Sequence, residues 1–266
     1  MKNNRILLTG AAGSLGTVLR PELSQVAASV RLNDVADIRD PAQHEEIIQC
    51  DLNDVDAVYK MTRDVDMVIH MGGACGEKPF AEILHSNITG FYNLFEGCRK
   101  NSVKRIIWGS SNHAVGMHPR VSRLSDSARP RPDSNYGVSK VWGEAMAQMY
   151  WDKFGIECVS IRIGSCFQKP VDRRMLNTWL SFPDLVHLVE CCVTAPRVEH
   201  TVIYGVSNND AVLWDNSHAA HIGYKPKSNG EAFRAEVEAA TRPYHHDDKT
   251  ISCHGGSLAA QGHIED

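Results

Sequence analysis

The chain has 266 residues, of which 42% are hydrophobic and 23% are charged, a composition typical of a globular protein with one large domain. Its formal net charge is −4, and without a basic field to attract polyanions we expect no nucleic-acid partner. The first residues lack the apolar core of a signal peptide, and no segment reaches the length of a membrane span. We therefore expect a cytoplasmic protein that does not bind a membrane.

Short apolar runs alternate with amphipathic stretches of helical length, such as 79–100, along most of the chain. Such runs, bounded by glycine or polar residues, are typical of strands buried on both faces of a parallel sheet. We expect strands at 5–10, 30–34, 46–51, 66–73, 103–111, 157–164 and 201–205. Strands that alternate with helices form right-handed βαβ units. The predicted fold class is α/β, a Rossmann-type doubly wound parallel sheet with a small C-terminal substrate-binding cap.

The regular alternation loosens after Gly164, which divides the chain into two regions. Residues 1–164 are expected to form the Rossmann domain. Residues 165–266 are expected to form mostly a cap over the carboxyl edge of the sheet, where such folds bind ligands, with late elements returning to the sheet.

Within the cap, residues 173–193 predict two helical pieces interrupted at Pro183. The following residues predict one more strand and two helices. From about residue 241 onward the sequence is expected to be loop-like and partly mobile.

A glycine-rich turn, TGAAGSLG, links the first predicted strand to a helix. Glycines at 10, 13 and 16 permit a tight turn and let backbone amides approach a pyrophosphate. Their spacing differs from the G-x-G-x-x-G pattern, and three glycines alone would be weak evidence. Their position between a strand and a helix is what indicates a dinucleotide-binding site. Asp34 ends the second strand about 20 residues further on, where an acid binds the ribose hydroxyls and repels the extra phosphate of NADP. NAD is therefore the expected cofactor.

Nearby polar residues have alternative interpretations. Asp34 could instead be a turn or helix-capping aspartate. Arg31 lies three residues earlier on an extended strand, so it is expected to point to the opposite face and not to bind phosphate. Asp51 and Leu52 follow the third strand and are expected to flank the adenine, although the DLND stretch at 51–54 could equally be only the N-terminal cap of the next helix.

Tyr136 and Lys140 lie four residues apart in NYGVSK, on one face of a predicted helix. A nearby ammonium lowers the pKa of a phenol, and a phenolate can take a proton from an alcohol as hydride leaves the same carbon. Such a pair alone is common by chance on exposed helices. Ser110 and Ser111, which end the preceding strand, are expected to add hydroxyl groups at the same edge and complete a Ser/Tyr/Lys set.

These motifs occur in the order found in the extended short-chain dehydrogenase/reductase family, which the sequence resembles across essentially the whole chain. The resemblance implies that Ser111 polarises the substrate oxygen, Tyr136 accepts the proton, and Lys140 holds the nicotinamide ribose and lowers the pKa of the tyrosine. It also implies that Asn87 supports a proton-relay water. The implied cofactor-binding residues are Gly10, Gly13, Ser14, Leu15, Gly16, Asp34, Asp51, Leu52, Gly72, Gly73, Tyr136 and Lys140.

Further stretches resemble one branch of this family, the uronate dehydrogenases: GEKPF at 76–80, SSNHAVG at 110–116, RIGSC at 162–166 and RMLNTWLS at 174–181. The resemblance implies oxidation of the anomeric hydroxyl of D-glucuronate or D-galacturonate to the aldarolactone, with NAD as acceptor. The implied substrate-binding residues are Cys75, Ser111, Asn112, His113, Ser165 and Arg174, and Ile163 and Cys166 would border the nicotinamide.

Three of these residues can be weighed on their chemistry. The Arg174 guanidinium matches a carboxylate bidentately, although a surface arginine that begins a helix is the alternative. His113 could instead be a structural histidine bonded to a backbone carbonyl. Cys75 stands where the family has a serine, and losing one neutral hydrogen bond, about 0.5–1.5 kcal/mol, is expected to raise the KM or alter the preference between epimers.

Two other functions remain open. A sugar-nucleotide epimerase or dehydratase shares the fold and keeps NAD bound through turnover, but needs a larger cap than the about 100 residues after Gly164. A NAD-sensing regulatory protein would not need the complete Ser/Tyr/Lys set.

The remaining motifs add no further site. HHDD at 245–248 has metal-ligand residue types but nothing to fix their geometry, so no metal is expected. The sequon that begins at Asn87 is better explained by the helix asparagine of the family. The family resemblance also favours a homo-oligomer.

Overall fold

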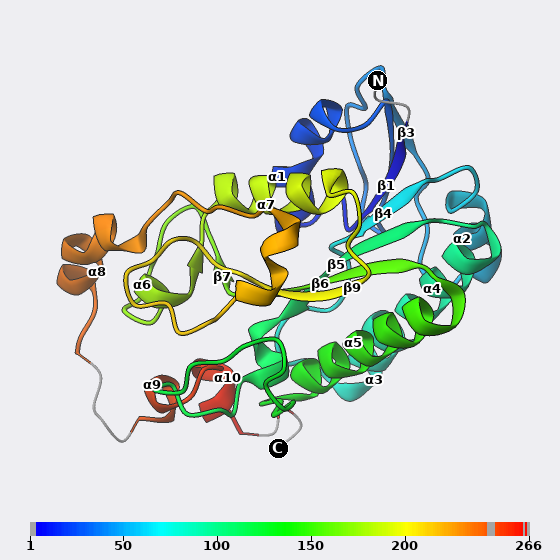
Figure 1. Ribbon diagram of the computed structural model, residues 1–266. Coiled ribbons are helices and arrows are strands. Elements are labelled where there is room, and N and C mark those ends of the chain that lie inside the picture. Colours follow the sequence, from blue (N-terminus) through cyan, green and yellow to red (C-terminus); the bar gives the residue numbers. More distant parts are fainter. Residues whose placement is uncertain (1–3, 244–247, 263, 265–266) are drawn as a thin grey trace.

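Seven parallel strands form one sheet within residues 4–243, 248–262 and 264, the part of the chain that the computed structural model describes (Figure 1). They are β1 (Arg5–Thr9), β2 (Ser29–Asn33), β3 (Glu45–Ile47), β4 (Met67–His70), β5 (Arg105–Ser111), β6 (Glu157–Ile163) and β9 (His200–Gly205). Their order in the sheet is β3-β2-β1-β4-β5-β6-β9. The predicted strands and the doubly wound α/β fold are confirmed.

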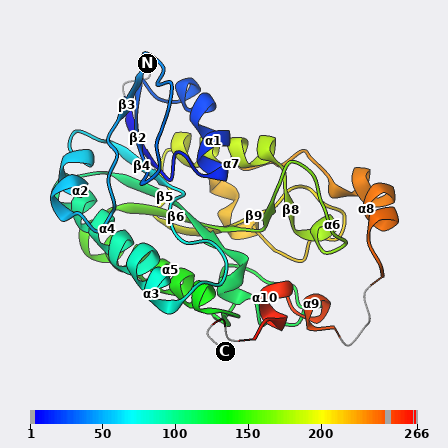
Figure 2. The same cartoon turned by 180° about the vertical axis from the view of Figure 1, so that it is seen from behind.

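Helices cover both faces of the sheet, because consecutive strand residues point to opposite faces and both sets of side chains are apolar. Leu8 of β1 belongs to the core cluster formed with one helical layer, and Leu7 belongs to the cluster on the other face. The two layers are seen edge-on in Figures 1 and 2. One contains α1 (Ser14–Leu19), η1 (Arg20–Gln25) and α7 (Phe182–Thr194), and the other contains α2 (Val55–Met61), α4 (Phe91–Lys100) and α5 (Asn135–Phe154).

The first strand lies between β2 and β4, so chain connections run in opposite directions on its two sides. A crevice opens at such a switch point, outside the carboxyl ends of the strands. The helical stretch at 79–100 approaches this crevice as α3 (Phe80–Ile83), the π-helical turn η2 (Leu84–Gly90) and then α4. The sequence predicted helix here, but not the wider π turn within it.

The region after β6 begins with a small parallel pair, β7 (Ser165–Cys166) and β8 (Trp179–Leu180), connected through α6 (Met175–Thr178). The predicted helix break at Pro183 is wrong. Pro183 lies in the first turn of α7, where a missing N–H costs nothing, and the chain leaves the helical path earlier, at β8. The Ser181 side chain caps α7 by accepting from the backbone N–H of Asp184.

The later residues form short helical elements: η4 (Ser217–Ile222), η5 (Gly230–Phe233), α8 (Arg234–Ala240), α9 (Lys249–Ser252) and α10 (Ser257–Ala260). The expectation of a loop-like end is therefore wrong for residues 249–252 and 257–260, which are helical, and correct for residues 253–256 between them. Between α9 and α10, His254 is only 3% exposed. In Figures 1 and 2, α10 lies beside the segment that leads into α5.

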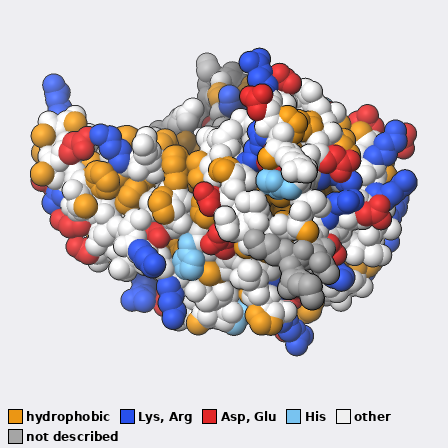
Figure 3. Space-filling view, turned by 90° about the horizontal axis from the view of Figure 1, so that it is seen from above, with side chains coloured by type: hydrophobic (Ala, Val, Ile, Leu, Met, Phe, Trp, Pro, Cys, Tyr) orange, Lys and Arg blue, Asp and Glu red, His pale blue; other side chains and the backbone are white. Residues whose placement is uncertain are grey.

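The surface charges are mixed in sign, as the small net charge of the sequence led us to expect. On the face seen in Figure 3, Lys and Arg side chains are interspersed with Asp and Glu side chains, without a continuous basic patch. Among the described residues, no helix combines the length and the apolar character needed to cross a membrane.

Candidate active site

A cavity of about 560 Å³ opens at the switch point beside β1. Predicted cofactor residues line it together: Gly10, Gly13, Asp34, Asp51, Leu52, Gly72 and Gly73. Sequence reasoning missed other lining residues, among them Asn33, Ala36, Glu82, His85 and Ser86. The cavity lining does not include Ser14, Leu15, Gly16, Ile163, Cys166, Tyr136 or Lys140.

Two glycines shape the floor of this cavity. Gly10 has a φ of +75°, and a Cβ there would collide with the backbone of Gly72 at the end of β4. Gly73 has a φ of +126°, and a Cβ there would lie 2.7 Å from the Asn87 amide oxygen. Both positions need glycine because the backbone conformation disfavours a side chain and the space is already filled.

Asp34 holds the glycine turn against the end of β2. Its carboxylate accepts hydrogen bonds from the backbone N–H groups of Ala12 (2.9 Å) and Ala36 (3.0 Å). Asp34 also belongs to the lining of the cavity. Arg31, as predicted, points elsewhere: its guanidinium is bound by Glu46 and by the carbonyl of Met61.

Asp51 also lines the cavity. The cap of α2 is Asp54, the last residue of the DLND stretch, which accepts from Ala57 N–H, so the capping alternative is confirmed for Asp54 and not for Asp51. His85 Nε2 donates to the Asp51 carboxylate at 2.8 Å. Burial alone would raise the pKa of Asp51, but hydrogen bonds from Asn53 and the contact with His85 lower it to about 2.

Helix α5 places Tyr136 and Lys140 on one face, below the end of β5. Ser134 caps the helix by accepting from Gly137 N–H at 3.0 Å. The Lys140 ammonium lies 5.2 Å from the centre of the Tyr136 ring and donates to the carbonyl of Gly109 at 2.7 Å. The predicted pairing of the two side chains is therefore present, and the lysine is buried rather than solvated.

Burial dominates the ionisation of both groups. It lowers the pKa of Lys140 to about 8, although the neighbouring Cys75 and Glu144 act to raise it. Burial also raises the pKa of Tyr136, and Cys75 raises it further, while a hydrogen bond with Ser111 acts in the opposite direction. The expected lowering of the Tyr136 pKa by its lysine is not found.

The 3-10 turn η3 (Asn112–Val115) follows directly after β5 and groups three predicted residues. Ser111 caps this turn by accepting from the N–H of His113 at 3.2 Å. His113 Nδ1 donates to the Asp133 carboxylate at 2.7 Å, so its partner is an acid and not the backbone carbonyl that sequence reasoning allowed. The His113 ring meets the Tyr136 ring edge-on, 5.7 Å between centres.

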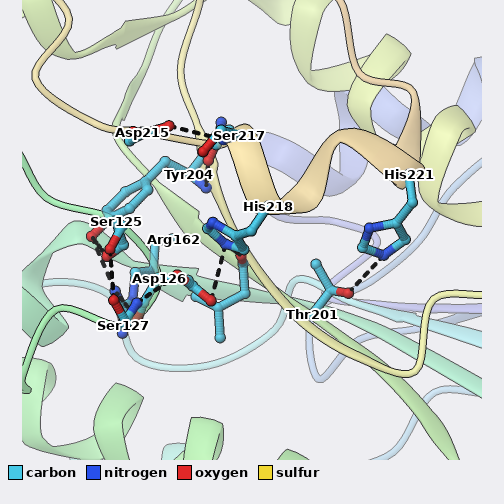
Figure 4. A network of polar contacts seen from close by, with 12 residues as sticks. Ser125, Asp126, Ser127, Arg162, Thr201, Tyr204, Asp215, Ser217, His218 and His221 are labelled. Carbon is cyan, nitrogen blue, oxygen red and sulfur yellow. Dashed lines mark hydrogen bonds and ion pairs between the residues drawn. The ribbon is translucent and has the colours of Figure 1, made fainter.

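Ser110 does not join this group, and its predicted place at the site is wrong. Neighbouring strand residues point to opposite faces of a sheet. Ser110 Oγ accordingly donates to Glu144 at 2.7 Å, and Glu144 is bound bidentately by Arg162 at 2.9 and 2.8 Å. Figure 4 shows Arg162 beside Tyr204 and the loop that contains Asp126, and its guanidinium donates to the Tyr204 hydroxyl and to the Asp126 carbonyl.

Asn87 occupies the π turn and connects three elements. Its amide nitrogen donates to the Ala74 carbonyl and to Ser139 Oγ, both at 3.0 Å, and its oxygen accepts from Ala74 N–H at 2.8 Å. The wider turn is a common device at functional sites. Here it anchors the loop after β4 to α5.

Arg174 precedes α6 and is half-buried, so it is not the surface arginine that its position allowed. Its Nη1 donates to Ser165 Oγ at 3.2 Å and its Nη2 donates to the carbonyl of His254 at 2.7 Å. With its amide oriented to suit its neighbours, Asn112 donates to the carbonyl of Ile163 and accepts from Arg174 Nη2, both at 3.1 Å. The guanidinium is thus connected to the residue that follows Ser111.

Two predicted residues border this arrangement from other elements. Cys75 is exposed on the loop after β4, and its thiol acts to raise the pKa of Tyr136. Cys166 on β7 is partly buried, and burial raises the pKa of its thiol to about 12, so it is an apolar wall and not a nucleophile.

Glu77 is a site residue that sequence reasoning missed. Its carboxylate accepts from the N–H groups of Asn135 and Tyr136, both at 3.1 Å, and so anchors the loop after β4 to the start of α5. An acid in the GEKPF stretch was visible, but its partner lies 58 positions away in the sequence.

The HHDD stretch falls outside the described residues except for Asp248, which caps α9 by accepting from Thr250 N–H. Within the described ranges, no group of three His, Cys, Asp or Glu side chains is placed to hold a metal ion.

Comparisons with known proteins show which family the chain belongs to. Residues 6–180 match the NAD dependent epimerase/dehydratase family. The chain is 50% identical over 260 residues to a uronate dehydrogenase from Pseudomonas putida, covering 97% of each chain. It is 44% identical to the solved glucuronic acid dehydrogenase of Chromohalobacter salexigens, with a TM-score of 0.97 over 99% of each chain.

A uronate dehydrogenase from Agrobacterium tumefaciens, solved as a tyrosine-to-alanine variant complexed with NAD, is 44% identical, with a TM-score of 0.95 over 98% of each chain. The predicted cofactor, NAD, agrees with the family description and with that complex. The chain belongs to the NAD dependent epimerase/dehydratase family and, within it, to the uronate dehydrogenases.

Proposed function

We propose that the protein oxidises the anomeric hydroxyl of a hexuronate, D-glucuronate or D-galacturonate, to the aldarolactone with NAD as acceptor. The carrying observation is the position of Arg174. Its guanidinium is hydrogen-bonded to Asn112, the residue next to Ser111, so a fixed cation stands beside the Ser/Tyr/Lys set. A planar guanidinium suits the carboxylate that distinguishes a uronate from a neutral aldose.

The residues of the site divide the chemistry between them. Tyr136 accepts the proton of the anomeric hydroxyl as its O–H bond breaks. The C–H bond of the anomeric carbon breaks at the same time, and a C=O bond forms. NAD, when bound, takes up the hydride. Ser111 donates a hydrogen bond to the reacting oxygen, and His113, held by Asp133, orients the sugar. Burial raises the pKa of Tyr136, and the hydrogen bond with Ser111 acts in the opposite direction, which favours the ionised form.

The cavity at the switch point suits the adenosine and pyrophosphate end of NAD. The glycine turn provides a floor that a Cβ at Gly10 would fill, and backbone amides there suit a pyrophosphate. Asp34 would hold the adenosine ribose, and Asp51 with Leu52 would border the adenine. Lys140 would hold the nicotinamide ribose, and Ile163 and Cys166 would border the nicotinamide.

The test is NADH formation with a panel of D-glucuronate, D-galacturonate, D-glucose and D-galactose. We expect turnover with the uronates, and we expect Arg174→Ala to raise the KM for uronate about 10- to 100-fold, as for the loss of a hydrogen-bonded charge pair. Arg173→Ala is the matched control, because Arg173 contacts Glu238 and the carbonyl of Thr241 instead. Equal activity on neutral aldoses, or an unchanged KM in Arg174→Ala, would contradict the assignment.

The same preparation tests the other functions. A sugar-nucleotide epimerase would retain its cofactor through purification and release no net NADH. If the protein were regulatory, Tyr136→Phe would leave every measurable activity and phenotype unchanged. We expect instead that this variant binds NAD but no longer oxidises the uronate.

A further inference from the structure

We propose that residues 253–256, the CHGG loop, form a wall of the substrate site that positions Arg174 and the His113–Asp133 pair, and thereby contributes to selectivity for a carboxylate. The proposal rests on the function proposed above. His254, Gly255 and Gly256 act here as positioning residues, since none of them is assigned to the reacting atoms.

The loop holds Arg174 from two sides. The His254 carbonyl accepts from Arg174 Nη2 at 2.7 Å, across 80 sequence positions. Gly256 packs against the same side chain: a Cβ there would lie 2.6 Å from Nε and 3.0 Å from Cζ. The φ of +66° at Gly256 also disfavours any side chain. The guanidinium therefore has little room to rotate between the loop and Ser165.

The loop is itself fixed by bonds to both ring nitrogens of His254. The Trp214 indole N–H donates to His254 Nδ1 at 3.1 Å. An indole nitrogen is only a donor, so Nδ1 is the acceptor and Nε2 carries the proton, which it donates to the Ser122 carbonyl at 2.9 Å. The backbone N–H of His254 donates to the His118 carbonyl at 3.0 Å. These bonds set where the His254 carbonyl meets Arg174.

Gly255 extends the same wall to the other side of the site. Its N–H donates to the Gly116 carbonyl at 2.8 Å, and a Cβ at Gly255 would collide with the Asp133 carboxylate. That carboxylate is fully buried and accepts from His113 Nδ1 at 2.7 Å. One loop thus contacts both the cation and the histidine that would flank the sugar.

The decisive variant is Gly256→Ala, with Gly262→Ala as the matched control. A Cβ at Gly262 would meet nothing within 4 Å, so the control adds the same methyl group to the same part of the chain without touching Arg174. In Gly256→Ala we expect the KM for uronate to rise about tenfold, the effect of losing one hydrogen bond to a charged group. The KM for NAD should not change, and the preference for uronates over neutral aldoses should fall.

A second variant removes the fixing bond without changing the loop. Trp214→Phe keeps an aromatic ring against Tyr204, where the present ring centres are 5.2 Å apart, but removes the donor to His254. We expect the KM for uronate to rise in this variant as well, by a smaller factor. If Gly256→Ala does not fold, as circular dichroism would show, Trp214→Phe decides the question.

Arg174→Ala, measured in parallel, separates the two ways in which the reasoning can fail. If it raises the KM for uronate while Gly256→Ala and Trp214→Phe do not, the proposed role of the loop is wrong and the proposed function stands. If Arg174→Ala also leaves the KM unchanged, the carboxylate-binding arrangement itself is wrong.

Discussion

Replacing Lys140 by methionine should stabilise the cofactor-free protein at neutral pH. Burial lowers the pKa of Lys140 from 10.5 to about 8, and at about 1.4 kcal/mol for each pKa unit the buried ammonium costs roughly 3 kcal/mol of folding free energy at pH 7. The side chain returns about 1 kcal/mol through its hydrogen bond to Gly109. Methionine has a similar volume and no charge, so we expect a net gain of about 2 kcal/mol.

The pH dependence identifies the cause of this gain. The unfolded chain keeps its proton up to a higher pH than the folded protein, so the wild-type protein becomes more stable as pH rises from about 8 toward 10.5. The advantage of Lys140→Met should therefore shrink by about 2 kcal/mol between pH 7 and pH ~9.5. Urea unfolding at the two pH values measures it, with Lys153→Met, an exposed lysine on the same helix, as the control. A variant that is less stable at pH 7, or whose advantage is the same at both values, would refute the reasoning.

Two more changes have defined outcomes. Arg162→Met should lower the free energy of unfolding by about 3–5 kcal/mol, because it leaves the Glu144 carboxylate buried without its partner. Adding Glu144→Gln should restore part of that loss, since it removes the unpaired charge. A double variant no more stable than Arg162→Met would contradict this explanation. Asp34→Ser should raise the catalytic efficiency with NADP relative to NAD, because it removes the carboxylate at the ribose end of the cavity; an unchanged ratio in steady-state kinetics would show that Asp34 only holds the glycine turn.

The central strands, such as β1, β5 and β6, could be predicted because they are buried on both faces and consist largely of apolar residues. The pairing of Tyr136 and Lys140 could be predicted because residues four positions apart lie on the same face of a helix, and this separation can be read directly from the sequence. Two errors were avoidable with local rules. Strand alternation places Ser110 and Ser111 on opposite faces, and a proline such as Pro183 is favoured in the first turn of a helix.

Other features were beyond sequence reasoning because they depend on contacts between distant segments. The role of Glu77 as an acceptor for the first amides of α5 requires the loop after β4 to reach that helix. The burial of His254 requires a partner, Trp214, from another part of the cap. The raised pKa of Tyr136 follows from how deeply the phenol is buried, which spacing to a lysine does not reveal.

The π turn at Leu84–Gly90 makes the length of this segment critical. A π turn contains one more residue than an α turn, so deleting a single residue here would restore ordinary helical bonding. The helix before the deletion would then rotate by about 100° relative to α4. Asn87 could then no longer contact both Ala74 and Ser139. The loop after β4 would lose its anchor to α5. Relatives that vary freely in exposed loops should therefore keep the residue count of this stretch.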